Sequence, residues 1–426
     1  MAPFPYLAWV AASTVLVPFA SRSETAKLAR ADVPRSRARE KLGFATGQRD
    51  ATQPLVWFHA ASVGESLSVL ALITRIGAAL PDTQFLITSG TATSADLIAR
   101  RMPPRCQHQF APLDAPGPLR RFLKHWCPDA AIFVESELWP QMLRRTHASG
   151  ARMALVNARL STDSVKRWQQ MPATARYMLD VFDLILTQND AMAETIVSLG
   201  APPARVARGI NLKSMADPLP VDHAALAEAQ TALRNRPVWI ASSTHQGEEQ
   251  SVLKAHQRLL RRWPDLCLIL APRHPARGQE VADLITEAGM SHSRRSAGDA
   301  PAGQVFLADT LGELGTWYAL SDIVFLGGSL RPIGGHNPFE VAHSGATVLS
   351  GTHVTNFAET FSGMEELGAA RFVSDAADLA EKVEALFSDT QGREMACAAA
   401  LEFAQQQTDK LDEIAARLIT TLELSA

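Results

Sequence analysis

The sequence predicts an α/β protein built from two doubly wound parallel sheets, each covered by helices on both faces. Short apolar runs typical of buried strands alternate with segments of helical spacing along almost the whole chain. Ten such runs are many for one sheet with a single switch point. A proline-containing break, Asp217-Pro218-Leu219-Pro220, lies near the middle and predicts a boundary between two domains.

The expected strands are short apolar runs, and segments with helical spacing, such as Leu67–Leu80 and Gln250–Arg262, lie between most of them. The strands are Leu55–His59, Gln84–Thr88, Ala130–Val134, Arg152–Val156, Leu184–Thr187, Val238–Ala241, Leu266–Leu270, Val305–Leu307, Ile323–Leu326 and Thr347–Leu349.

The domain boundaries follow from this pattern. We expect a membrane anchor at 1–21, an N-terminal domain at 22–215 and a C-terminal domain at 221–395. The final segment, 396–426, has helical spacing and could pack back across the first domain.

Composition describes a globular protein without a global basic field. Of 426 residues, 46% are hydrophobic and 20% charged, which is enough to build a sizeable core, and the net charge of −3 argues against a nucleic-acid partner. The four cysteines are scattered without a CxxC pair, which favours a reducing compartment and disfavours a zinc site or disulfide framework.

The first 21 residues depart from this soluble character. They contain no charged side chain and approach the roughly 20 residues that span a bilayer. Positive charge after the segment and none before it predicts an anchor in the inner membrane with the body in the cytoplasm. The alternatives are a buried N-terminal helix and a monotopic helix lying on the inner leaflet. The basic residues that follow are Arg22, Lys27, Arg30, Arg35, Arg37, Arg39 and Lys41.

The most informative stretch is the glycine-rich segment from Gly327 to Glu340. It follows a strand-like run and ends in Asn337-Pro338, which reads as an N-cap followed by the first helical residue. Glycines between a strand and a helix allow close approach of a ligand, and the helix N-terminus offers N–H groups to a phosphate. The alternative is structural, with Glu340 closing a capping box on Asn337.

Other polar residues follow the expected strand ends, where parallel sheets bind ligands. Glu65 follows the first strand, and Glu135 and Glu137 follow the third. Lys213 follows Val206–Ile210. In the second half, Ser242–His245 and Pro272-Arg273-His274 occupy such positions. Each has a structural alternative. Glu65 can stabilise a helix dipole, Glu135 and Glu137 can be surface acids, Arg273 can pair with a neighbouring acid, and Ser242–Thr244 can be an N-cap cluster.

These residues belong to a series of motifs running from the apolar N-terminal segment to about Ala370. The motifs are His59-Ala60-Ala61-Ser62-Val63-Gly64-Glu65, Glu135-Ser136-Glu137-Leu138-Trp139-Pro140, Asn157-Ala158-Arg159-Leu160-Ser161, Asn211-Leu212-Lys213, Ser243-Thr244-His245-Gln246-Gly247-Glu248-Glu249, Pro272-Arg273-His274-Pro275, Gly312-Glu313-Leu314 and Gly327 to Glu340. In this order they resemble the 3-deoxy-D-manno-octulosonic acid (Kdo) transferases of Gram-negative lipid A assembly. The resemblance implies a GT-B fold, in which two Rossmann-like domains face a cleft.

The resemblance also implies roles for individual residues. Glu65 matches the proton acceptor, and Glu135 and Lys213 match positions that stabilise the transition state. The sequence departs from the family pattern at Ser136, Gln141, Gln246 and Leu311, and an extra Ile210 precedes Asn211-Leu212-Lys213. The residues matching the CMP-binding segments are Pro272, Arg273, Leu311, Gly312, Glu313, Asn337, Pro338, Phe339 and Glu340.

The implied reaction is inverting transfer of Kdo from CMP-Kdo to lipid IVA at the cytoplasmic side of the inner membrane, within lipopolysaccharide synthesis. The chain has no DxD motif to anchor a cation on a sugar diphosphate, so we expect no metal and no cofactor beyond the donor substrate. The helix N-terminus at Glu65 is expected to lower the pKa of that carboxyl. The alternatives are another GT-B nucleotide-sugar enzyme and a non-catalytic, membrane-tethered protein that binds lipid A or a nucleotide.

Overall fold

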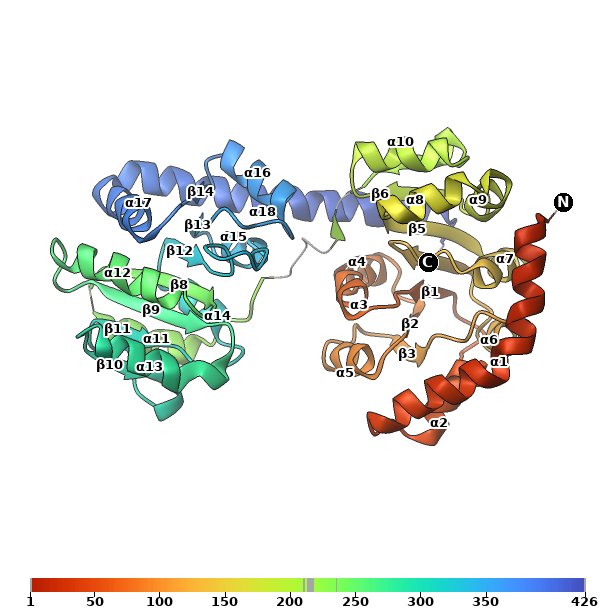
Figure 1. Cartoon of the computed structure of the whole chain (residues 1–426), viewed down its shortest axis with the longest axis horizontal. Coiled ribbons are helices and arrows are strands. Elements are labelled where there is room, and N and C mark those ends of the chain that lie inside the picture. The colour runs from red at the N-terminus through yellow and green to blue at the C-terminus, as the bar shows by residue number, and fades with distance from the viewer. Residues whose placement is uncertain (1, 210, 213–217, 235, 425–426) are drawn as a thin grey trace. The chain divides into compact units, whose positions relative to one another are not determined.

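The computed structural model describes residues 2–209, 211–212, 218–234 and 236–424 (Figure 1). The chain forms two compact units. One consists of Met1–Met215 with Asp409–Ala426, and the other of Ala216–Thr408. Each unit contains one parallel sheet with helices on both faces, so the predicted fold class is confirmed.

The sheet of the first unit has the strand order β3-β2-β1-β4-β5-β6-β7, and every neighbouring pair is parallel. The chain adds strands on one side of β1 and then on the other, so the switch point lies between β1 and β4. The strands are β1 (Leu55–His59), β2 (Gln84–Ser89), β3 (Cys106–Phe110), β4 (Ala130–Val134), β5 (Arg152–Ala158), β6 (Leu184–Thr187) and β7 (Val206–Arg208).

Alternate residues of β1 enter the two apolar layers of this unit. Val56 and Phe58 belong to one cluster, and Leu55 and Trp57 to the other, as a period of two requires. The described helices up to residue 198 are α1 (Phe4–Arg30), α2 (Arg35–Ala38), α3 (Val63–Ser68), α4 (Leu70–Ala79), α5 (Ala92–Arg100), α6 (Pro116–Trp126), α7 (Pro140–Ala148), α8 (Thr162–Gln169), α9 (Pro172–Leu179) and α10 (Asp190–Ser198).

The second unit repeats this plan with the order β10-β11-β9-β8-β12-β13-β14, all parallel, and its switch point lies between β8 and β12. The strands are β8 (Val238–Thr244), β9 (Cys267–Pro272), β10 (His292–Arg294), β11 (Val305–Leu307), β12 (Ile323–Leu326), β13 (Thr347–Ser350) and β14 (Ala370–Phe372). The helices are α11 (His223–Leu233), α12 (Glu249–Leu260), α13 (Gly278–Glu287), α14 (Leu314–Tyr318), α15 (Phe339–His343), α16 (Ala358–Glu366) and α17 (Ala376–Ser388).

The last helix, α18 (Thr390–Thr421), starts six residues before the expected boundary at 396. Phe403 and Ala404 lie in an apolar cluster of the second unit. Leu411 and Leu418 lie in the cluster of the first unit that contains Val56. The helix therefore contributes core residues to both units.

Several element boundaries differ from expectation. Strand β8 continues to Thr244, so the interpretation of Ser242–Thr244 as an N-cap cluster is wrong. Helix α15 begins at Phe339 with Pro338 as N-cap, one residue later than expected, although Asn337 Oδ1 still accepts the Phe339 N–H at 3.1 Å. Helix α1 runs beyond residue 21 to Arg30.

Candidate active site

The acidic residues of the first unit lie at its switch point. Glu65 is in the first turn of α3, which follows the loop leaving β1, and Glu135 and Glu137 follow β4 directly. Because β1 and β4 are parallel neighbours, their carboxyl ends meet at one edge of the sheet. This edge, at the point where the strand order reverses, is where sheets of this class bind ligands.

Glu65 is buried, and both of its carboxylate oxygens accept hydrogen bonds. Ser62 Oγ donates to Oε1 at 2.7 Å, and the Ala61 N–H donates to Oε2 at 2.9 Å. Burial raises the pKa of Glu65, and although the Ser62 hydrogen bond opposes this effect, the charges of Glu137 and Glu135 add to it. The expectation that the helix N-terminus lowers this pKa is wrong, because lost hydration and like charges outweigh the local donors. A raised pKa makes Glu65 a stronger base.

His59, the last residue of β1, connects the buried sheet to Glu137. Its Nδ1 lies 2.9 Å from Thr88 Oγ1, and its Nε2 lies 3.4 Å from Glu137 Oε2. Burial disfavours the charged form of Glu137, but His59 and the indole N–H of Trp139 outweigh burial and lower the pKa of that carboxyl. Glu137 therefore favours the ionised form, while Glu65 binds a proton more readily.

Glu135 is held by a buried amide from the neighbouring strand. Asn157 Nδ2 donates to Glu135 Oε1 at 3.2 Å, and Asn157 Oδ1 accepts the Leu212 N–H at 3.3 Å. The amide thus joins Glu135 to the segment that leads into Lys213. Lys213 itself, predicted to stabilise the transition state, lies outside the described residues.

Arg273 follows β9 in the second unit and has an exposed side chain. Its backbone N–H donates to Thr244 O at 3.0 Å, which ties it to the end of β8. Among the residues that the structure describes, Arg273 takes part in no ion pair, so the alternative of a pairing with a neighbouring acid finds no support. Its side chain is exposed, so a solvent-borne anion can approach the guanidinium.

The segment around Leu311 offers a backbone turn more than side chains. Leu311 is 77% exposed, and Gly312 has a φ of +85°, which favours glycine. Glu313 is already engaged, because Arg295 Nη2 lies 2.7 Å from its Oε1 and the Thr310 hydroxyl donates to Oε2. Burial opposes ionisation of Glu313, but these partners lower its pKa overall.

The residues from Asn337 to Glu340 divide between the core and the surface. Phe339 is buried and stacks on Phe403 with ring centroids 5.3 Å apart, so its side chain is a core residue. Pro338 is buried, whereas Asn337 and Glu340 are half-buried. The polar members of this segment can therefore meet a ligand, and Phe339 can do so only through its backbone.

Glu248 holds the glycine-rich loop in a way that the sequence did not predict. It is fully buried, and its carboxylate accepts the N–H groups of Gly328 at 2.7 Å, Ser329 at 2.9 Å, Leu330 at 2.8 Å and His245 at 2.9 Å. The amides at the start of the loop are therefore satisfied by the protein and do not face a phosphate. The available signal was an acid three residues after His245, the spacing of a capping box.

Three histidines, which the sequence placed at strand ends or in the glycine-rich segment without a role, lie close together in the structure. His245 follows β8, His274 follows β9, and His336 lies in the loop that follows β12. His245 and His336 are 2.9 Å apart between their Nε2 atoms. The loops that follow β8, β9 and β12 thus bring imidazoles to the neighbourhood of Arg273.

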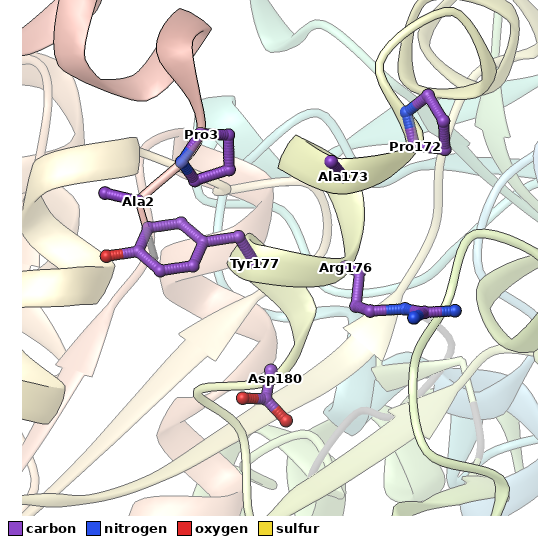
Figure 2. A pocket seen from close by; sticks show the side chains of 7 residues that line it. All are labelled: Ala2, Pro3, Pro172, Ala173, Arg176, Tyr177 and Asp180. Atoms are coloured by element: carbon purple, nitrogen blue, oxygen red, sulfur yellow. The ribbon is translucent and has the colours of Figure 1, made fainter.

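No group of three or more His, Cys, Asp or Glu side chains suited to a metal occurs within the described parts of the chain. A separate hollow of about 710 Å³ lies between the start of α1 and helix α9 (Figure 2). None of the predicted site residues lines it. Its lining residues are Ala2, Pro3, Pro172, Ala173, Arg176, Tyr177 and Asp180.

Comparison with known proteins shows which protein family this chain resembles in sequence. The family model of 3-deoxy-D-manno-octulosonic-acid transferase (Kdotransferase) matches residues 36–216. The chain is 34% identical over 365 residues to the 3-deoxy-D-manno-octulosonic acid transferase of Haemophilus influenzae, covering 84% of this chain and 85% of that protein. It is 33% identical over 368 residues to the probable mitochondrial 3-deoxy-D-manno-octulosonic acid transferase of Arabidopsis thaliana, covering 84% and 82%.

One solved structure of another protein has the same overall fold as this chain. The glycosyltransferase from Rickettsia africae ESF-5 superimposes with a TM-score of 0.57 over 88% of this chain and 100% of that one, at 15% sequence identity. At this identity the likeness concerns the fold, and it agrees with the predicted GT-B fold with two Rossmann-like domains.

Proposed function

Because the chain belongs to the 3-deoxy-D-manno-octulosonic acid (Kdo) transferase family of glycosyltransferases, we propose that it moves Kdo from CMP-Kdo to lipid IVA with inversion at the anomeric carbon. The observation that carries the proposal is Glu65. It is a buried carboxylate with a raised pKa at the switch point of a parallel sheet, within a motif of the family.

Glu65 is proposed to be the general base. The acceptor is a sugar hydroxyl, which is a weak nucleophile until a positioned group takes its proton. Hydrogen bonds from Ser62 and Ala61 fix both carboxylate oxygens, so the side chain is oriented before substrate binds. A base acting on the face of the sugar opposite the leaving group gives inversion.

The leaving group needs positive charge rather than a proton, because CMP departs as a stabilised phosphate. Arg273 supplies an exposed guanidinium without an acidic partner among the described residues, and Asn337 and Glu340 are half-buried polar residues of the same unit. Glu135 and Lys213 are proposed to stabilise the transition state from the first unit. No metal or further cofactor is part of this proposal.

Helix α1 is proposed to bind the membrane while lying on the first unit. It is long and apolar enough to cross a bilayer, but only Ser13 and Leu28 are buried, so the alternative of a buried N-terminal helix is wrong. Asp114 Oδ2 accepts the indole N–H of Trp9 at 2.6 Å, and the Ser13 hydroxyl accepts the side-chain amide of Gln141. A helix docked on polar groups of the folded body cannot also cross the bilayer at these residues.

The opposite face of α1 suits a lipid surface. Phe4, Leu7, Val15, Leu16 and Phe19 are 51–81% exposed. Figure 1 shows α1 along the first unit with a bend, and Pro18 lies inside the helix, where a proline removes a backbone hydrogen bond and favours a kink.

Exposed basic side chains extend this surface. Of the seven basic residues expected to flank the apolar segment, five are exposed, whereas Lys41 is buried and donates to Gly90 O at 3.0 Å, and Arg37 is half-buried. An apolar helix face beside exposed positive charge favours a monotopic anchor on an anionic leaflet. The exposed five are Arg22, Lys27, Arg30, Arg35 and Arg39.

A transfer assay tests the proposed function. The purified protein is supplied with CMP-Kdo generated in situ and with tetra-acylated lipid A precursor. The mass of the lipid product is then measured by mass spectrometry. We expect a mass increase by whole Kdo units and none with a UDP-sugar donor. Transfer from the UDP-sugar instead would indicate another nucleotide-sugar enzyme, and CMP binding without transfer would indicate a binding protein.

A further inference from the structure

The histidine pair at the second switch point is a built feature of the fold. His245 and His336 are 91 residues apart in sequence, yet their rings are parallel to within 8° and their Nε2 atoms are 2.9 Å apart. The ring of His274 stands edge-on to His245, with centroids 5.7 Å apart. Each histidine comes from a different loop at the carboxyl end of β8, β9 or β12.

The surrounding backbone fixes this pair. Glu248 accepts the N–H of His245 and those of Gly328, Ser329 and Leu330, so one buried carboxylate holds both loops together. Gly328 has a φ of +70°, and a Cβ there would lie 2.8 Å from His336 Cδ2. The glycine therefore makes room for the imidazole against the loop backbone.

An Nε2–Nε2 hydrogen bond limits the charge of the pair. One nitrogen must donate and the other accept, so the neutral pair holds one proton between the two nitrogens. A further proton on an outer nitrogen gives a pair with a single positive charge. Placing protons on both facing nitrogens would oppose two donors at 2.9 Å. The pair therefore takes up at most one proton in this geometry.

Neighbouring charges and burial determine the pKa at which the pair takes up that proton. Arg273 and His274 follow β9 and disfavour a positive charge on the pair, while Glu248 and Glu249 at the start of α12 favour one. Burial lowers the pKa of His336 to about 4, with the positive neighbours adding to this effect, and burial also lowers the pKa of His245. Without an anion the pair is therefore neutral near pH 7.

We propose that the His245–His336 pair takes up one proton when the phosphate of a cytidine nucleotide binds beside Arg273, and that this proton stabilises the bound phosphate. The proposal rests on the proposed function, since it takes the second unit to hold the CMP donor. The phosphorus group of a nucleotide sugar carries one negative charge. When the sugar leaves, the phosphate gains a second charge, which the protonated pair can meet. The proton comes from solvent, and no covalent bond within the pair changes.

Proton uptake can be measured by calorimetry of the full chain in detergent. CMP is titrated at pH 7 in two buffers with different ionisation enthalpies, and the difference gives the number of protons taken up. We expect an uptake approaching about one proton for the wild type, with CMP affinity rising by up to about tenfold for each unit that pH falls. Cytidine, which lacks the phosphate, should bind without uptake.

Variants assign the proton to the pair. His336→Gln and His245→Gln should each abolish the uptake and flatten the pH dependence, whereas His223→Gln, an exposed histidine at the start of α11, should change neither. CMP binding to the wild type without proton uptake would overturn this proposal alone, as would uptake that persists in both variants. Absence of CMP binding to the wild type would overturn the donor assignment together with it.

Discussion

The side-chain amide of Asn157 donates to Glu135 Oε1 across 3.2 Å, and both residues hold a left-handed backbone, with φ of +55° and +57°. Left-handed conformations are uncommon for residues other than glycine, and asparagine adopts them more readily than most. Strand β5 shifts its register against β6 between Leu155 and Ala158, so the backbone at Asn157 departs from regular pairing. Two strained residues thus share one hydrogen bond at the predicted catalytic edge.

Substitutions at Asn157 separate its backbone role from its amide. Asn157→Gly keeps the left-handed conformation and removes the amide, whereas Asn157→Ala removes both. If the amide positions Glu135, both variants should lower kcat by about tenfold or more, because a misplaced group costs rate even when it still binds. CMP affinity should stay unchanged in both. If Asn157→Gly kept the wild-type kcat and only Asn157→Ala lost activity, the residue would serve only to hold the left-handed backbone.

Glu248→Gln tests the support of the glycine-rich loop. Glutamine has one acceptor oxygen and would aim an NH2 group at backbone donors, so at least one buried hydrogen bond is lost. We expect a loss of about 3 kcal/mol in the free energy of unfolding, measured by urea denaturation, together with weaker CMP binding. Glu381→Gln is the matched control, because Glu381 is an exposed residue of α17, and it should leave the urea midpoint in place. An equal effect of the two substitutions would contradict the account.

Arg273→Ala and Glu340→Ala test the donor site. Loss of a charged hydrogen-bonding group should weaken CMP binding by about 10- to 100-fold for Arg273, and Glu340→Ala should also weaken it, while acceptor binding is retained. Calorimetry with CMP measures the effect, and Arg261→Ala, at an exposed position after α12, serves as the control. Unchanged CMP affinity in both variants would mean that neither residue binds the donor, so that Glu340 has a structural role and Arg273 is a surface charge.

Most strands could be predicted from the sequence, because buried strands appear in it as short apolar runs. Strands β1, β4, β6, β11 and β12 have the predicted bounds. Strand β3, with the sequence Cys-Gln-His-Gln-Phe, was not predicted, because three of its five residues are polar and only pairing with β2 shows it to be a strand.

The site was predictable where residues lie close in sequence and hidden where they do not. The loop and helix that carry Glu65 follow from local signals. The hydrogen bonds from Asn157 to Glu135 and from the glycine-rich loop to Glu248 join residues 22 to 82 positions apart, and no local pattern encodes them. The pKa of Glu65 was predicted in the wrong direction, because burial, together with the charges of Glu137 and Glu135, acts on this carboxyl only in the folded chain.

Charged substitutions on the apolar face of α1 test the membrane proposal. Leu16→Glu with Phe19→Glu should lower binding to anionic vesicles and activity on vesicle-embedded acceptor, because both side chains are exposed and would meet lipid. Activity on detergent-dispersed acceptor should be retained. Met395→Glu, an exposed apolar position on α18, is the control. Removal of residues 1–22 is a less direct test, because it also removes the hydrogen bond that the indole N–H of Trp9 donates to Asp114. Unchanged vesicle binding in the double variant would contradict the anchor.

The central measurement is Kdo transfer by Glu65→Gln beside CMP binding by the same protein. Loss of a general base should lower the transfer rate by about 100- to 10,000-fold. CMP affinity should stay close to that of the wild type, because Glu65 belongs to the first unit and the donor residues to the second. The wild-type rate should rise with pH as Glu65 ionises, with its acid limb above the ordinary value of 4.5.

Stability gives the control for folding. The raised pKa means that the folded chain binds a proton on Glu65 more tightly than the unfolded chain, so this group costs stability as pH rises above 4.5. Glu65→Gln removes that cost and should not lower the unfolding midpoint at pH 7 beyond the loss of its hydrogen bonds. We expect a folded Glu65→Gln variant that binds CMP and fails to transfer Kdo. A folded variant with near-wild-type transfer would contradict it.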